Sequence, residues 1–229
     1  MSLKPKKVSE IKKIQEKMKA KASKKEPLKK LPPYTIIVSE GIKTEPIYIK
    51  GFANKINERY KNISKNPHIV VYGTGRNTNG LIRFVDKMIA DGKWAHYKKI
   101  WLMYDKDDFP SDNFDNTQFE AEARKNPTMA VAWSNESIEL WFLLYFEDYY
   151  ANNGRKQYIE KLNKYIDYSK TREDLCDILA EKGSLEDAKR RARKMYQEFL
   201  DSKISSMSAM VPATRVFELI EELESYLND

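Results

Sequence analysis

Acidic side chains stand directly after two apolar segments of this sequence, and acids in such places can hold metal ions. Glu40 and Glu45 follow the first segment, and Asp105 and Asp107 follow the second. Residues two apart on an extended chain point the same way, so Asp105 and Asp107 are expected to project together. Carboxylates that converge without histidine favour a hard cation, Mg²⁺ or Mn²⁺, over zinc. Two such ions could activate a water molecule and stabilise the leaving oxygen of a phosphodiester.

The composition excludes several other kinds of site. The 229 residues include one cysteine, Cys176, and two histidines, His68 and His96. The single cysteine rules out an internal disulfide framework and favours a reducing cytoplasm, and with two histidines it leaves almost no material for a zinc site or a histidine-based triad. No run of about 18 apolar residues exists, and no apolar segment follows the lysine-rich start. We therefore expect a cytoplasmic protein with no membrane span and no secretory signal.

Predicted strands and helices alternate along the part of the chain that carries these acids. Short apolar runs, rich in β-branched residues, predict strands, and amphipathic stretches between them predict helices. Such alternation is typical of an α/β fold with a parallel sheet, whose ligands bind at the carboxyl ends of the strands. If the first and third strands are neighbours, Glu40 faces Asp105 and Asp107. The expected strands are 34–38, 68–72, 99–104 and 128–133, and the expected helices are 45–60, 81–90 and 114–124.

The remainder of the chain reads as helical. Residues 138–146 are apolar nearly all round, which predicts a buried helix. A capping box at Ser184 opens an amphipathic helix, and Pro212 opens a last one. We therefore divide the chain into a basic, flexible tail (1–30), an α/β core (31–150) and a helical extension packed on the core (151–229).

Positive charge is concentrated in the tail. The formal net charge is +7, and residues 1–30 carry twelve lysines against three glutamates. The tail is either a lysine arm that meets nucleic-acid phosphates, with Lys29 and Lys30 next to the core, or a solvated leader that aids solubility. Arg76, in a turn-rich loop, is a further candidate for backbone contact. Arg190 and Arg193 belong to a basic helical cluster that is either a phosphate-binding patch or a solvated face.

Taken singly, these signals are weak, but their order resembles a known fold. A strand, Glu40-Gly41, a helix, a strand, a helix, a strand and Asp105-x-Asp107 resemble the TOPRIM fold of topoisomerases, primases and OLD-type nucleases. Several segments, covering roughly residues 34–225, resemble the RloB-like family more specifically. They are Glu40-Gly41-x-x-Thr44-Glu45-Pro46-x-Tyr48, Asp105-x-Asp107-Asp108-Phe109, Ser134-Asn135-x-x-x-Glu139-Leu140-Trp141-x-Leu143-Leu144-x-Phe146, Tyr168-x-Lys170 and Pro212-x-Thr214-x-Val216.

The resemblance implies a prokaryotic anti-phage defence protein, encoded beside an AAA-type ATPase, that cleaves nucleic acid with Mg²⁺ or Mn²⁺. By similarity to TOPRIM proteins, Glu40 is the general acid or base. Lys170 steadies the scissile phosphate, and the segment that begins at Ser134 supplies a further catalytic acid. This segment departs from the family pattern, so both Glu136 and Glu139 remain candidates for that acid. The implied metal ligands are Glu40, Glu45, Asp105, Asp107 and Asp108.

Our hypothesis is thus a TOPRIM-like nuclease with about four parallel strands flanked by helices and a helical C-terminal extension. A different class is a non-catalytic nucleic-acid-binding or regulatory subunit, in which the acids only order a loop. A DxD phosphatase or a glycosyltransferase would use the aspartates but leave Glu40-Gly41 without a role. The sequence does not decide whether the substrate is DNA or RNA, or whether the protein is a monomer or a homodimer.

Overall fold

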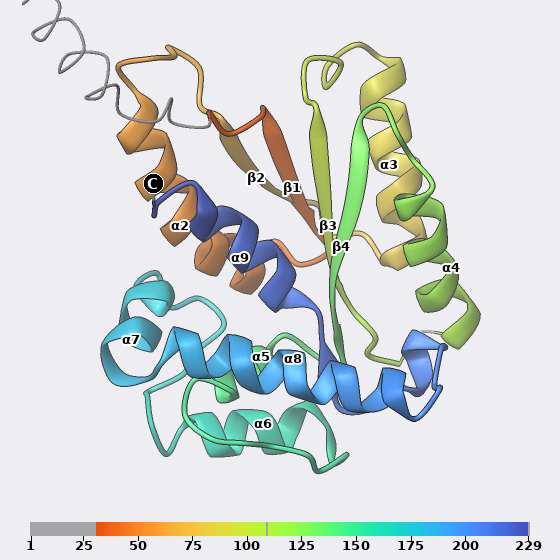
Figure 1. The fold of residues 1–229 in the computed structure, drawn as a ribbon, viewed down its shortest axis with the longest axis vertical. Helices are drawn as coiled ribbons and strands as arrows, with labels where there is room; N and C mark the ends of the chain where they lie inside the picture. Colours follow the sequence, from red (N-terminus) through yellow and green to blue (C-terminus); the bar gives the residue numbers. More distant parts are fainter. Residues whose placement is uncertain (1–30, 109, 229) are drawn as a thin grey trace, which may run out of the picture. The chain divides into compact units, whose positions relative to one another are not determined.

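Four parallel strands and one short antiparallel strand form the central sheet (Figure 1). The computed structural model describes residues 31–108 and 110–228. The strand order is β2-β1-β3-β4-β5. β1 therefore lies beside β3, as the hypothesis required, and the expected α/β class is confirmed. The strands are β1 (Thr35–Ser39), β2 (Ile69–Gly73), β3 (Lys99–Asp105), β4 (Thr128–Asn135) and β5 (Ala213–Thr214).

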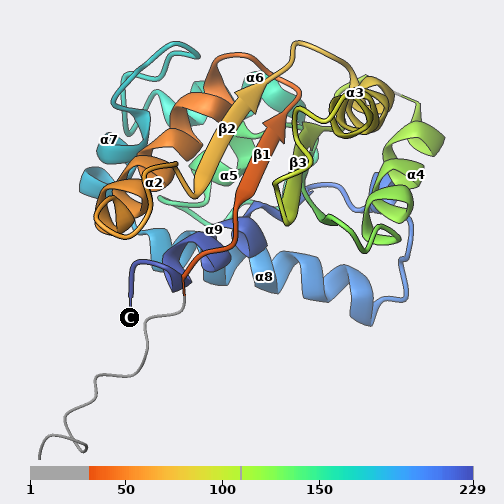
Figure 2. The same ribbon diagram turned by 90° about the horizontal axis from the view of Figure 1, so that it is seen from above.

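The inner strands are buried because helices cover both faces of the sheet. α2 (Thr44–Tyr60) and α9 (Val216–Ser225) lie on one face, and α3 (Thr78–Ala90) and α4 (Ser111–Glu122) lie on the other. Figure 2 shows the sheet between these two layers. β1 is buried along its whole length, and β3 is buried from Ile100 onward. This two-sided burial explains why both strands are nearly continuous apolar runs.

A group of helices follows β4 and lies below the sheet in Figure 1. It consists of α5 (Glu139–Leu143), α6 (Gly154–Leu162), α7 (Leu175–Lys182) and α8 (Leu185–Asp201). The side chain of Ser184 accepts a hydrogen bond from the Asp187 N–H, as the capping box predicted. Residues 32–228 form one compact unit, so these helices and the sheet belong to the same body.

The chain returns to the sheet after α8, and here the sequence interpretation was wrong. A 3₁₀ turn (Met207–Ala209) leads to β5, and α9 begins at Val216 rather than at Pro212. β5 pairs antiparallel with the end of β4, with Thr214 opposite Ser134. The C-terminal segment therefore completes the sheet and covers part of one face.

Candidate functional site

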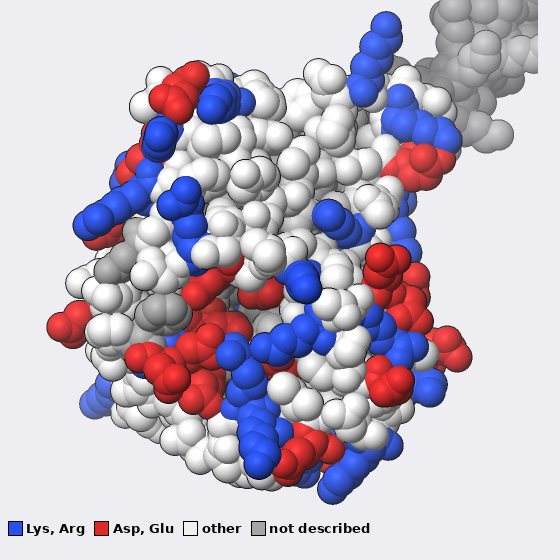
Figure 3. Space-filling view, turned by 180° about the vertical axis from the view of Figure 1, so that it is seen from behind, with Lys and Arg blue, Asp and Glu red and all other residues white. Residues whose placement is uncertain are grey.

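A pocket lies where the parallel strands end, and acids from separate elements line it. It encloses about 280 Å³. Figure 3 shows a recess in the surface in which acidic atoms gather, with basic atoms along its border. β1 and β3 run in register, with Ser39 beside Met103, so the residues that follow both strands reach the same edge. The lining residues are Glu40, Gly41, Ile42, Lys43, Thr44, Glu45, Asp105, Asp107, Ile138, Glu139, Arg155 and Lys170.

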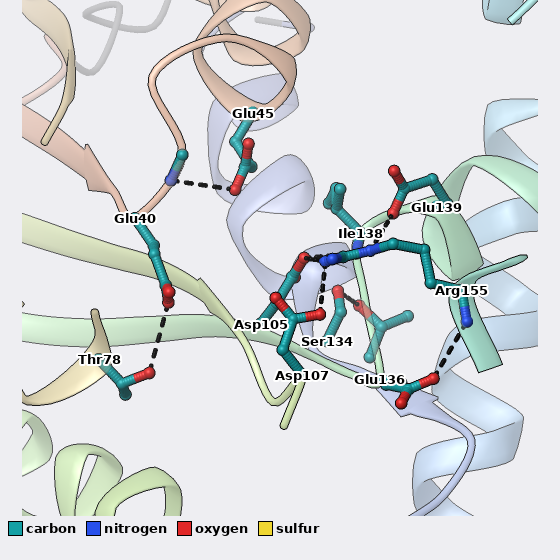
Figure 4. A network of polar contacts seen from close by, with 12 residues as sticks. Glu40, Glu45, Thr78, Asp105, Asp107, Ser134, Glu136, Ile138, Glu139 and Arg155 are labelled. Carbon is teal, nitrogen blue, oxygen red and sulfur yellow. Dashed lines mark hydrogen bonds and ion pairs between the residues drawn. The ribbon is translucent and has the colours of Figure 1, made fainter. Parts of the chain in front are cut away.

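Glu40 is the first residue after β1 and is half-buried. Its Oε2 accepts a hydrogen bond of 3.3 Å from the hydroxyl of Thr78, at the start of α3 (Figure 4). Burial raises the pKa of Glu40 to about 7, and the charges of Asp107 and Glu45 act in the same direction. This carboxyl can therefore take up or release a proton near neutral pH.

Glu45 stands in the first turn of α2 and is buried. Its Oε1 accepts a hydrogen bond from the N–H of Gly41 at 3.2 Å. A Cβ atom on residue 41 would lie 2.2 Å from Oε2 of Glu45, so any side chain there would displace this buried carboxylate. Burial is the main cause that raises the pKa of Glu45, and the nearby charge of Glu139 contributes.

Asp105 and Asp107 both reach the pocket, but for different reasons. Asp105 is the last residue of β3, and its Oδ2 accepts a hydrogen bond from the N–H of Ile138. Asp107 lies in a turn with φ +38°, a left-handed conformation that aspartate tolerates better than most residues. The turn, and not strand alternation, therefore aims Asp107 at the pocket. Burial raises the pKa of both carboxyls, and Arg155 opposes that shift.

Arg155 lies among these acids, and the sequence interpretation did not include it. Its Nη2 is 3.0 Å from Oδ2 of Asp105 and 2.6 Å from Oδ1 of Asp107. Its Nε is 3.4 Å from Oε2 of Glu139. Figure 4 shows the guanidinium between the three carboxylates. One signal could have pointed to it: several acids at buried strand ends need a cation, and Gly154-Arg155 opens a helix after the acidic segment.

The structure separates the two candidate acids after β4. Glu139 opens α5, is 1% exposed and lines the pocket, where its Oε1 accepts a hydrogen bond from the hydroxyl of Tyr168. The Oε2 of Glu136 instead accepts a hydrogen bond of 3.0 Å from the N–H of Arg155, at the start of α6. Ser134 is buried away from the pocket lining, and its hydroxyl shares a hydrogen bond with the hydroxyl of Thr214 at 2.9 Å. Glu139 is therefore the acid placed with Asp105 and Asp107.

Comparison with known protein families identifies a match to most of the chain. The sequence model of the family described as RloB-like protein matches residues 35–223. The chain belongs to the RloB-like protein family. The match includes every residue that lines the pocket. No curated protein and no solved structure matches the chain. Within the described part of this RloB-like chain, no helix combines the length and the apolar character that a membrane crossing requires.

Of two further predicted residues, Lys170 lies at the edge of the RloB-like pocket and Asp108 lies outside it. Lys170 lines the pocket and is exposed, and its carbonyl oxygen accepts a hydrogen bond from the hydroxyl of Thr44 at 3.1 Å. The loop that carries Lys170 is thereby tied to the start of α2. Asp108 is exposed and is not among the lining residues. The structure thus brings Lys170 to the acids and leaves Asp108 outside.

The predicted basic residues have different surroundings. Arg76 is exposed in the loop between β2 and α3, with its guanidinium 4.9 Å from the ring centroid of Phe84. On α8, Arg190 pairs with Asp187, and Arg193 pairs with Glu221. These pairs favour the interpretation of α8 as a solvated face. The tail of residues 1–30, with Lys29 and Lys30, lies outside the described residues.

Magnesium or manganese fits the chemistry of the RloB-like pocket. Its acids offer carboxylate oxygens, and no histidine or cysteine lines it. Glu139 Oε2 is buried and accepts no hydrogen bond, and its described ion pair with Nε of Arg155 is long at 3.4 Å, so this oxygen can still contact a further cation. Within residues 31–108 and 110–228, no three acidic, histidine or cysteine side chains form a ready metal site, and Arg155 lies among the acids. The donor types are thus those that a hard cation prefers, but a guanidinium already pairs with three of the acids.

Proposed function

We propose that this RloB-like protein is a metal-dependent, nuclease-like enzyme that cleaves phosphodiester bonds in nucleic acid. One observation carries the proposal: an acid that follows β1 and acids at the end of β3 and the starts of α2 and α5 converge in a single pocket at the strand ends. Residues far apart in sequence bury their charges there at a cost to folding, and such costs are typical of functional sites. The proposal keeps the TOPRIM-like interpretation, with Glu40 and the Asp105–Asp107 pair as its central residues.

The degree of burial of each side chain indicates its role. The buried carboxylates of Asp105 and Glu139, with that of Asp107, would hold the ions. Bound Mg²⁺ or Mn²⁺ supplies the positive charge that lets a phosphodiester approach these acids and stabilises the leaving oxygen. Glu40 is suited to proton transfer at its carboxylate oxygens because its pKa is raised to about 7. Lys170, exposed at the pocket edge, is placed to contact a phosphate.

We further propose that the enzyme acts with an AAA-type ATPase encoded nearby, in anti-phage defence. Support for this role comes from membership of the RloB-like family, because the resemblance to that family implies a defence role and an ATPase partner. Exposed Arg76, on the loop beside the pocket residue Glu40, would extend the contact with the nucleic-acid backbone.

The test is a cleavage assay with the full chain, alone and with the neighbouring ATPase. Duplex DNA, single-stranded DNA and structured RNA are incubated with Mg²⁺, Mn²⁺ or EDTA. We expect metal-dependent cleavage that Asp105→Asn abolishes. Asp108→Asn is the matched control, because Asp108 is exposed outside the pocket, and it should cleave at the wild-type rate. Absence of cleavage under every condition, or equal cleavage by Asp105→Asn, would refute the proposal.

A non-catalytic binding subunit remains the second candidate, and Arg155 is the observation that favours it. A guanidinium already pairs with Asp105, Asp107 and Glu139, so the cluster could serve only to join α6 to the sheet. In that case nucleic acid should bind equally well with and without divalent ions, and the chain should cleave no nucleic acid. A phosphatase that uses Asp105 as its nucleophile is disfavoured, because this carboxylate is buried and engaged by Arg155 and by the N–H of Ile138.

A further inference from the structure

Arg155 occupies the place among the acids at which a bound cation would lie. Its guanidinium contacts three carboxylates, those of Asp105, Asp107 and Glu139. The arginine side chain is 31% exposed, whereas that of Asp105 is 9% exposed and that of Glu139 is 1% exposed. The guanidinium thus covers the buried acids from the solvent side of the pocket.

The backbone of Arg155 is held independently of these acids. Its N–H donates to Oε2 of Glu136 at 3.0 Å. The preceding Gly154 has φ +82°, and a Cβ atom there would lie 2.8 Å from the same oxygen. Glu136 therefore fixes the first turn of α6 beside the pocket whether or not the guanidinium stays on the carboxylates.

One guanidinium is a poor match for this much negative charge. Arg155 reaches Asp105 and Asp107 with the same Nη2 atom, and Oε2 of Glu139 still accepts no hydrogen bond. Glu40 and Glu45 line the same pocket without a described ion pair to Arg155. A divalent ion offers twice the charge in a smaller volume, and it binds carboxylate oxygens directly. Such an ion and the guanidinium would also repel each other at close range.

We propose that Arg155 is a positioning residue that competes with the divalent ion for Asp105, Asp107 and Glu139, and that metal binding transfers its guanidinium to a substrate phosphate. This inference rests on the proposed function, because it needs a metal at these acids. The anchor at Glu136 keeps the released side chain at the pocket. A guanidinium there can bind phosphate oxygens with two parallel hydrogen bonds.

The first experiment measures Mn²⁺ affinity by titration calorimetry on the full chain. Arg155→Gln should bind Mn²⁺ about tenfold more tightly than the wild type, because the acids are no longer occupied by a competing cation. Arg155→Lys keeps the charge and should stay within a few-fold of the wild type. Arg215→Gln is the matched control: this arginine also pairs with two carboxylates, Glu122 and Glu218, but is not among the residues that line the pocket. Its Mn²⁺ affinity should not change.

The second experiment uses the wild-type protein, so it does not depend on a variant that folds. The Nε–H resonance of Arg155, identified by its loss in Arg155→Lys, is followed by NMR during a Mg²⁺ titration. We expect a shift that saturates with the dissociation constant measured by calorimetry. If Mg²⁺ binds and the resonance does not move, or if Arg155→Gln binds Mn²⁺ no more tightly, the inference is wrong and the proposed function stands. If neither the wild type nor Arg155→Gln binds metal, both this inference and the proposed function are wrong.

The transfer to phosphate has its own readout. In Ca²⁺, which occupies oxygen sites and often does not support turnover, binding of a labelled oligonucleotide is compared between variants. Arg155→Gln should bind it about tenfold more weakly than the wild type, despite holding metal more tightly. Equal or tighter oligonucleotide binding by Arg155→Gln would overturn this part of the proposal.

Discussion

Replacing Glu40 by glutamine should make the protein more stable, because the native fold holds this carboxyl at a cost. In the folded protein the pKa of Glu40 is raised from 4.5 to about 7, chiefly by burial and next by Asp107. Below pH 4.5 the carboxyl is protonated in both the folded and the unfolded chain, so it has no effect on stability. Between pH 4.5 and 7 the folded chain binds more protons, so the free energy of unfolding falls as the pH rises.

The size of the effect follows from the shift. The pKa of Glu40 rises from 4.5 to about 7 on folding. Above pH 7 this rise corresponds to a loss of at most about 3.4 kcal/mol in the free energy of unfolding. Glu40 is only half-buried, so solvent screening reduces this figure, and we expect about 1–2 kcal/mol. Glutamine keeps an oxygen that can accept the hydrogen bond from Thr78. Little of the gain should therefore be lost to a broken contact.

The assay is urea unfolding followed by circular dichroism from pH 5 to pH 8, with EDTA present. Glu40→Gln should exceed the wild type by about 1–2 kcal/mol at pH 8, and the difference should shrink steadily toward pH 5. Glu181→Gln, at an exposed position of α7, is the control and should match the wild type throughout. A Glu40→Gln variant that is no more stable than the wild type at pH 8 would refute the reasoning from burial and like charge.

Three further predictions concern the surroundings of the pocket. Gly41→Ala places a Cβ atom 2.2 Å from Oε2 of Glu45, and urea unfolding should show a loss of about 1–3 kcal/mol. Arg76→Ala should lower the salt dependence of nucleic-acid binding by about one phosphate contact, whereas Arg193→Ala, at an ion-paired residue of α8, should leave that dependence unchanged. Glu136→Ala removes the acceptor at the start of α6, and hydrogen exchange should become faster in α6, consistent with about 1 kcal/mol of lost stability.

Most of the fold could be predicted because its central strands are continuous apolar runs and its longer helices carry an apolar face at helical spacing. The strands β1 and β3 are buried on both faces, and the amphipathic face of α8 agrees with its capping box. The elements that sequence reasoning missed are short or polar. β5 has two residues, and α6 buries only Tyr158 and Leu162 of its nine. Such segments are specified by contacts with the rest of the fold rather than by their own pattern.

The site could be predicted only where the topology decides it. Parallel strands end at one edge, so Glu40 and Asp105 had to meet once β1 and β3 were neighbours. The choice between Glu136 and Glu139 depends on the turn after β4, which no periodicity describes. Arg155 is 50 residues from Asp105 along the chain, and its local sequence offers only one hint, its place at the start of a helix after the acidic segment. Its pairing with three carboxylates of the pocket is evident only from the folded structure.

If the acids of this pocket share a divalent ion, an anomalous difference map from a crystal soaked in Mn²⁺ will reveal it. We expect a peak among Asp105, Asp107 and Glu139, about 2.0–2.4 Å from carboxylate oxygens, with the guanidinium of Arg155 moved away from them. A map at saturating Mn²⁺ with no peak in the pocket, and with Arg155 still paired to these acids, would contradict it.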